Sequence, residues 1–143
     1  MLVATVMEIA KRYEDLVYWQ LADELETMVL ELIAKGPASK DFKFRNQIED
    51  SASSAPRNMA EGFGRFWPRE HAQFLRVALG SLMETHNAAR TGWKKGYFTQ
   101  EQAERMQSLA MRSKAAATGM INYLDSLPPR PPGLRRPRGN TEP

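Results

Sequence analysis

Apolar residues recur along most of the chain at spacings of three and four, the spacing of one face of an α-helix. No segment alternates apolar and polar residues as a half-buried strand would. The first helix is expected to begin at Ala4 or Tyr13 and to end at Lys35, because Gly36-Pro37 stops helices. Its apolar face contains Leu21, Leu25, Met28 and Leu32.

A second helix is expected from Asp41 to Phe63, with a proline inside it. Pro56 removes one backbone donor and crowds the preceding turn, so it predicts either a kink or a split after Ser54. The apolar face of this segment contains Phe44, Ile48, Ala52, Ala55, Met59 and Phe63.

Two further helices complete the pattern. The third begins at Pro68 and ends at Lys94-Lys95-Gly96, and the fourth follows Thr99, whose spacing from Gln102 fits a capping box, and ends at Leu127. The apolar face of the third helix contains Leu75, Ala78, Leu82, Ala89 and Trp93. The apolar face of the fourth contains Ala103, Met106, Ala110, Ala117, Ile121 and Leu124. Four helices with short connections predict an all-α, antiparallel up-and-down four-helix bundle over residues 1–127.

Residues 128–143 are rich in proline and arginine and contain little to bury, which predicts a disordered, flexible tail. The net charge of +3 resides in this tail, so the bundle itself is neutral and its charge does not indicate nucleic-acid binding. Three roles stay open for the tail: a solubilising end, a contact for RNA or single-stranded DNA, or a docking peptide for an acidic protein. The candidate contact residues are Arg130, Arg135, Arg136, Arg138, Lys94 and Lys95.

The residues that usually carry chemistry are scarce. The chain has no cysteine, and neither His71 nor His86 has a glutamate three residues before it, so no metal site is expected. Gly62-Phe63-Gly64 lacks the third glycine of a phosphate loop. We therefore expect no cofactor and no enzymatic activity. No membrane span and no signal peptide are found in the sequence, which predicts a cytoplasmic protein.

Acidic residues next to apolar helix faces have two interpretations. Glu61 and Glu84 could form a catalytic carboxylate pair, or they could accept hydrogen bonds that fix the register of the helices. Buried polar networks are commoner than unrecognised active sites, so we favour the structural interpretation. The predicted network consists of Glu61, Glu84, Asn58, Ser81 and Arg65.

Small and aromatic residues mark candidate subunit contacts. A glycine inside a helix costs about 1 kcal/mol relative to alanine, so close packing on another helix is the expected reason for it. Three large rings also crowd the turn between the second and third helices, which suits a subunit contact. The predicted oligomer interface contains Phe63, Phe66, Trp67, Gly80 and Gly119.

Several short motifs occur together between residues 13 and 127. They include Asp15-Leu16 with Trp19-Gln20, then Ser54-Ala55-Pro56 leading into Asn58-Met59-Ala60-Glu61-Gly62, then Gly64-Arg65, Glu70, Phe74-Leu75, Ala78 with Gly80-Ser81-Leu82, Glu84, and Gly96-Tyr97. With these motifs the chain resembles the four-helix-bundle family of ribosomal-RNA intervening-sequence proteins of bacteria. The resemblance implies a ring, typically a homopentamer, and no catalytic residues. Relatives include the accessory variability protein of diversity-generating retroelements, a pentamer that binds nucleic acid and a reverse transcriptase.

The chain departs from that family at three places, one of which is His71, where the family usually has an aromatic residue after the glutamate. Glu49-Asp50 stands where the family tends to have arginines, which argues against a basic ring surface, and Trp67-Pro68 replaces the usual serine cap of the third helix. The sequence therefore predicts a non-enzymatic, homo-oligomeric scaffold or adaptor, with the tail reaching an acidic partner. The alternative is an accessory protein that binds RNA or single-stranded DNA or acts with a reverse transcriptase.

Overall fold

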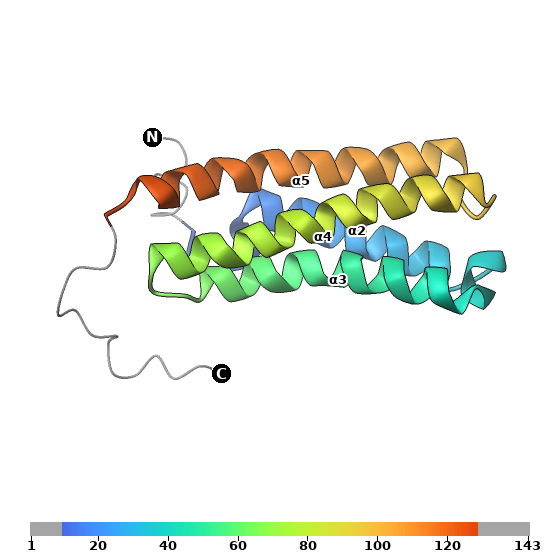
Figure 1. Ribbon diagram of the computed structural model, residues 1–143, viewed down its shortest axis with the longest axis horizontal. Coiled ribbons are helices and arrows are strands. Elements are labelled where there is room, and N and C mark those ends of the chain that lie inside the picture. Colours follow the sequence, from blue (N-terminus) through green and yellow to red (C-terminus); the bar gives the residue numbers. More distant parts are fainter. Residues whose placement is uncertain (1–9, 129–143) are drawn as a thin grey trace.

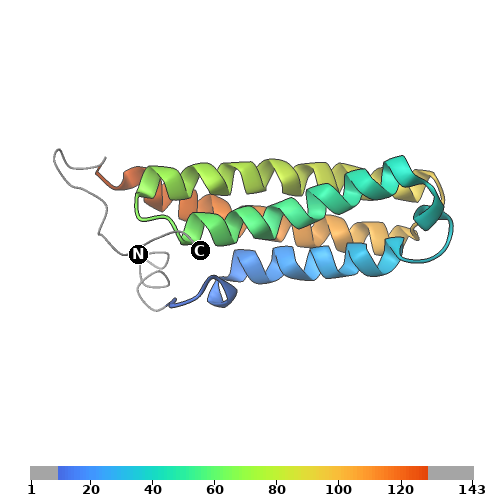
Figure 2. The same ribbon diagram turned by 90° about the horizontal axis from the view of Figure 1, so that it is seen from below.

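Residues 10–128 are described by a computed structural model, and within them four long helices run up and down side by side (Figures 1 and 2). The helices are α2 (Val17–Ile33), α3 (Phe42–Phe63), α4 (Pro68–Lys94) and α5 (Gln100–Ser126). Two 3-10 turns, η1 (Tyr13–Asp15) and η2 (Pro37–Lys40), precede α2 and α3. The predicted antiparallel up-and-down four-helix bundle is confirmed.

The core lies along the bundle axis because each helix turns one apolar face inward. Helices that follow one another in the chain pack together, and α2 also packs against α5, which closes the bundle into a square. Leu25, Ile48, Leu82 and Met106 are fully buried and represent the four helices in this core. Alanines on α3 and α4 let these two helices approach closely.

The helix ends follow local sequence signals. Thr99 accepts from the backbone of Gln102 and the Gln102 side chain accepts from the backbone of Thr99, which forms the predicted capping box of α5. Asp41 caps α3 by accepting from the Phe44 backbone N–H. Pro68 occupies the first turn of α4, as predicted.

Two details of the predicted helices were wrong, and the alternative left open at Pro56 was decided. The first helix begins at Val17, because Tyr13–Asp15 forms η1 and Leu16 is extended. The chain does not split at Pro56, which lies buried inside the continuous α3. Trp93 does not join the core but is 46% exposed, since Ala89 and Gly92 form the inward face of the last turns of α4. The tail predicted over 128–143 lies outside the described residues, except for Pro128.

Candidate functional site

A hollow of about 480 Å³ lies between the beginning of α2 and the second half of α3, and we call it the acidic hollow. Its floor is apolar, because the buried Pro56 and the half-buried Ala60 face it from α3. One wall is aromatic: the Tyr13 and Trp19 rings meet edge to face with centroids 5.2 Å apart. The lining residues are Tyr13, Trp19, Asp23, Glu26, Ser53, Pro56, Arg57, Ala60 and Glu61.

The charge of this hollow is negative. Asp23, Glu26 and Glu61 contribute three carboxylates and Arg57 contributes one guanidinium. Asp23 and Glu26 lie one helical turn apart on α2, are half-buried, and form no ion pair with any residue of 10–128. Glu24, between them in sequence, is paired with Arg105 of α5. The acidic hollow therefore presents carboxylates whose charge the described part of the chain leaves unneutralised.

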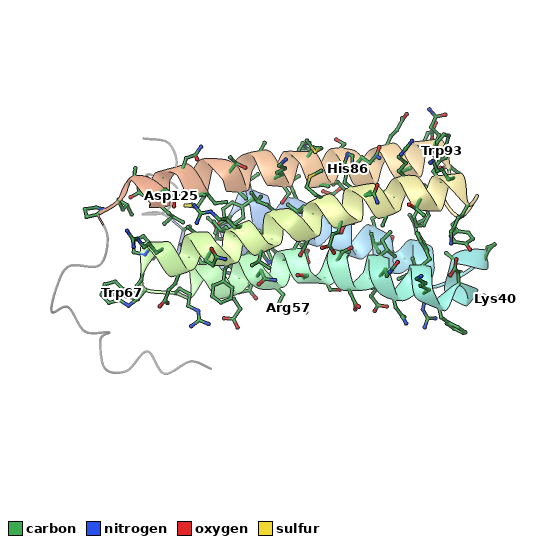
Figure 3. The ribbon with its side chains drawn as sticks, in the orientation of Figure 1. Lys40, Arg57, Trp67, His86, Trp93 and Asp125 are labelled. Atoms are coloured by element: carbon green, nitrogen blue, oxygen red, sulfur yellow. The ribbon has the colours of Figure 1, made fainter. Side chains whose placement is uncertain are left out.

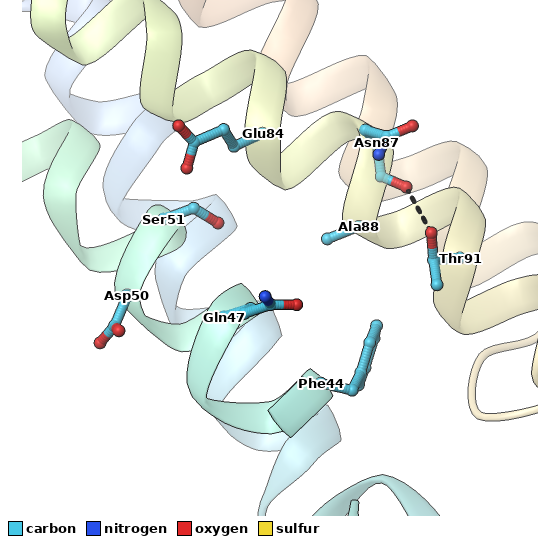
Figure 4. Close-up of a pocket in the computed structure, with 8 residues that line it drawn as sticks. All are labelled: Phe44, Gln47, Asp50, Ser51, Glu84, Asn87, Ala88 and Thr91. Atoms are coloured by element: carbon cyan, nitrogen blue, oxygen red, sulfur yellow. Dashed lines mark hydrogen bonds between the residues drawn. The ribbon is translucent and has the colours of Figure 1, made fainter. Parts of the chain in front are cut away.

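A second hollow, of about 420 Å³, lies between α3 and α4 (Figure 4). Its lining is mostly polar, and its two carboxylates, Asp50 and Glu84, are exposed and point in different directions. No hydrogen bond joins these two carboxylates. This groove lacks the paired acid and base that hydrolysis by two carboxylates requires.

Hydroxyl side chains connect α3 to α4 next to this groove. Ser81 donates to Ser54 Oγ at 2.7 Å, and Thr85 Oγ1 lies 2.9 Å from Ser51 Oγ. Asn58 donates to the same Ser54 hydroxyl at 3.0 Å. The Ser81–Ser54 and Thr85–Ser51 hydrogen bonds join two helices that approach closely and fix their register.

The structure brings together only part of the predicted polar network. Ser81 and Asn58 meet at the Ser54 hydroxyl. Glu61 is exposed and pairs with Arg65 at 3.8 Å on its own helix, while Glu84 lines the other hollow. The two glutamates lie on different grooves, so they form neither a carboxylate pair nor one network with the hydroxyls. Sequence spacing suggested otherwise because it does not give the axial register between α3 and α4.

The predicted interface residues are placed in different surroundings. Phe63 packs partly against the core and meets His71 edge to face, and Trp67 is buried. Phe66 is 44% exposed, with its ring edge to face against Trp67. Gly80 lies on the exposed face of α4, where a Cβ would meet no atom within 4 Å, so it does not serve close packing inside this chain. Gly119 is half-buried on α5.

Two glycines that serve close packing within the chain are Gly62 and Gly92. A Cβ on Gly62 would lie 3.0 Å from Phe74 Cβ and 3.1 Å from the His71 backbone oxygen. A Cβ on Gly92 would overlap the Phe98 ring. Sequence reasoning missed Gly92 because the contact comes from Phe98, in the loop that follows α4, and only the turn of the chain brings that ring back over the helix.

Of the predicted cationic contacts, only two lie in the described residues. Lys94 is exposed at the end of α4, and the Lys95 ammonium lies 3.0 Å from the Asp41 carboxylate. Arg130, Arg135, Arg136 and Arg138 lie outside the described residues. Trp93 and Trp67 mark opposite ends of the bundle (Figure 3), so the exposed Trp93 lies beside Lys94 and far from the end where α5 stops.

Burial strongly raises the pKa of Tyr18. Two other groups with strongly shifted pKa values lie near opposite ends of the bundle. A hydrogen bond from the Tyr97 hydroxyl, at 2.6 Å, and one from Lys95 lower the pKa of Asp41 to about 2. Burial lowers the pKa of His71 to about 4, and its Nε2 has no hydrogen-bond partner among the described residues. Neither group borders the acidic hollow.

Within residues 10–128, no three side chains of histidine, aspartate or glutamate are grouped as metal ligands would be. No helix in this range has an apolar stretch long enough to cross a membrane. Sequence reasoning missed the acidic hollow itself. The i, i+3 spacing of Asp23 and Glu26 was visible in the sequence, but their position beside Trp19 and α3 was not.

Comparison with known proteins agrees with this architecture. A crystal structure of a protein of unknown function from the S23 ribosomal protein family, from Bacteroides thetaiotaomicron, matches with a TM-score of 0.66 and 20% identity. The match covers 73% of this chain and 98% of the other, and at this identity it establishes the fold alone. No curated protein matches the chain. The family model of the 23S rRNA-intervening sequence protein matches residues 14–119, and the chain belongs to that family.

Proposed function

We propose that this protein is a non-enzymatic, cytoplasmic scaffold that assembles as a homo-oligomer, a pentameric ring, through the exposed face of α4. The observation that carries the proposal is Gly80. A glycine inside a helix costs about 1 kcal/mol relative to alanine, and no packing inside the chain offsets that cost here. Contact of Gly80 with a neighbouring subunit would explain why a glycine stands at this position.

The surroundings of Gly80 support an interface. Val77, one turn before it, is 46% exposed, and Phe66 presents its ring at the beginning of the same helix. An apolar residue and a glycine on one exposed face allow another helix to approach closely. The described residues offer no paired acid and base, which favours a scaffold over an enzyme.

The test is the mass of the particle in solution, measured by light scattering after size exclusion. The proposal expects about five times the chain mass of 16.2 kDa. Gly80→Leu should reduce this mass to that of a single chain. Because the position is open in the folded chain and leucine favours helix, the isolated subunit should keep its helicity and its melting temperature.

Arg112→Leu is the matched control, since it adds the same side chain at an exposed position of α5 and should leave the particle intact. A wild-type protein with the mass of one chain would contradict the ring. A Gly80→Leu protein that keeps the wild-type mass would remove α4 from the interface.

A second candidate function is nucleic-acid binding, and the exposed Trp93 favours it. An exposed indole beside Arg90 and Lys94 is able to stack on a base while the cations contact phosphates. The test is binding of RNA and single-stranded DNA across a salt series, where each phosphate contact contributes roughly 0.7–0.9 to the slope of log affinity against log salt.

Trp93→Ala and a variant with glutamine at Arg130, Arg135, Arg136 and Arg138 separate the two sets of contacts. The first should weaken binding with little change in the salt slope, and the second should reduce the slope. The absence of binding by the wild-type chain at low salt would contradict this function.

A further inference from the structure

The acidic hollow has the chemistry of a site for arginine. A guanidinium is planar, donates to carboxylates through two parallel N–H groups, and stacks on aromatic rings. The hollow offers half-buried carboxylates from Asp23 and Glu26 next to the Trp19 ring. A lysine would balance the negative charge of the hollow but would stack less well on its aromatic wall.

The chain itself contains a segment with the complementary charge. Beyond Pro128 stand four arginines and a single acidic residue, Glu142, whereas the hollow has three carboxylates and one guanidinium, that of Arg57. The described bundle is otherwise close to electrically balanced, since the net charge of +3 belongs to the tail. The tail and the hollow carry opposite net charges, so they attract each other. This complementarity makes the tail a preferred partner of the hollow.

The geometry also allows the two regions to meet. In Figure 2 the end of α5, the beginning of α2 and the end of α3 lie at the same end of the bundle, and α5 packs directly against α2. Proline-rich sequence spans about 3.1 Å per residue, so the seven residues from Pro128 to Arg135 reach roughly 22 Å. That is about two helix diameters, enough to pass α2 and enter the groove between α2 and α3.

We propose that the acidic hollow is the docking site for the arginine-rich tail of this protein, residues 129–143, from the same chain or a neighbouring subunit. One guanidinium, from Arg135 or Arg136, lies between Asp23 and Glu26 and against Trp19. This goes beyond the proposed ring, because it supplies, within this protein, the acidic partner that the sequence predicts for the tail. It does not depend on the ring. A docked tail is withheld from phosphates and from other acidic surfaces until a stronger competitor displaces it.

The absence of native cysteine permits a clean test by disulfide trapping in the full-length chain. One cysteine is placed in the tail by Thr141→Cys and a second in the hollow by Ser53→Cys, and the yield of the linked peptide is measured by mass spectrometry after mild oxidation. The control pair combines Thr141→Cys with Gln73→Cys, at an exposed position on α4 near the same end of the bundle. A tail without a docking site would reach the more exposed control position at least as well.

We expect the pair in the hollow to link at least about fivefold faster than the control pair at low salt, and the advantage to disappear near 0.5 M salt, where charges are screened within a few ångströms. Asp23→Asn with Glu26→Gln should abolish the advantage. Asp50→Asn with Glu84→Gln, which removes the same charge from the other hollow, should leave it intact.

Equal linking rates for the two pairs would overturn the proposal, and so would an advantage that survives Asp23→Asn with Glu26→Gln. Circular dichroism of each variant shows whether the bundle is folded, so loss of the fold cannot be mistaken for loss of docking. Particle mass is measured on the same samples. Failure of docking in a particle of five chains would contradict only the docking, whereas a single-chain mass with intact docking would contradict only the ring.

Discussion

The two ends of the bundle are built differently. At one end Asp41 caps α3 and also accepts from Tyr97 and Lys95, so α3 is tied to the loop between α4 and α5. At the other end, around the turn that holds Phe66 between α3 and α4, the buried His71 has an Nε2 with no hydrogen-bond partner among the described residues. The first end pairs these polar groups within the chain, while the second keeps a buried nitrogen without a partner, which costs stability. Natural proteins keep such features where they serve a purpose, which agrees with a docking site in the acidic hollow near the second end.

The two ends are also expected to lose stability in different ranges of pH. His71 has a pKa of about 4 in the folded chain, below the ordinary value of 6.5, so its stabilising contribution is complete above pH 6.5 and is lost as the pH falls towards 4. Asp41 has a pKa of about 2, below its ordinary 3.8, so its contribution is lost only as the pH falls from about 4 to 2. The Phe66 end should therefore weaken first on acidification.

The largest expected effect comes from His71. Between pH 6.5 and pH 4 the free energy of unfolding should fall by roughly 2–3 kcal/mol, because the unfolded chain binds a proton that the buried imidazole refuses. His71→Met, which fills irregular space without titrating, should flatten this part of the profile. Urea unfolding measured at half-unit steps of pH gives the comparison. An unchanged slope in the variant would show that other groups cause the acid sensitivity.

A pair of glycine substitutions comes next in size. Gly92→Ala forces a Cβ into the Phe98 ring, 3.0 Å from Phe44 Cζ, and should lower the free energy of unfolding by about 2 kcal/mol. Gly80→Ala enters open space and should raise it by about 0.5–1 kcal/mol. Chemical denaturation of the single-chain form of each variant measures these two changes in the free energy of unfolding. If both substitutions changed the free energy of unfolding equally, the close contact of Gly92 with Phe98 would not be what makes alanine unfavourable at that position.

The smallest effect is expected at Asp41. Asparagine is also a good helix cap, so Asp41→Asn should keep the capping bond to Phe44 and lose the charge-assisted bonds to Tyr97 and Lys95. The melting temperature at pH 7 should fall by a few degrees, and the difference from wild type should vanish near pH 2, where the wild-type carboxyl also protonates. Melting curves recorded by circular dichroism from pH 2 to 7 test this. A difference that persists at pH 2 would assign the effect to geometry and not to charge.

The sequence by itself determined the number, order and approximate bounds of the helices. The i, i+3 and i, i+4 apolar spacing, Pro68 and the capping box at Thr99 are local signals, and local signals act before any tertiary contact forms. The motifs between residues 13 and 127 likewise identified the family. Pro56 could not be resolved in this way, because a helix continues through proline only when packing holds the adjacent turns.

Only the tertiary structure decided which side chains meet. The axial register of α3 against α4 joined Ser54 to Ser81 and separated Glu61 from Glu84, and the return of the chain after Gly96 placed Phe98 over Gly92. The acidic hollow required η1, α2 and α3 to lie together, since its aromatic wall and its floor come from segments about 40 residues apart. Register and long-range contact depend on the packing of whole helix faces, and the periodicity of one helix does not contain that information.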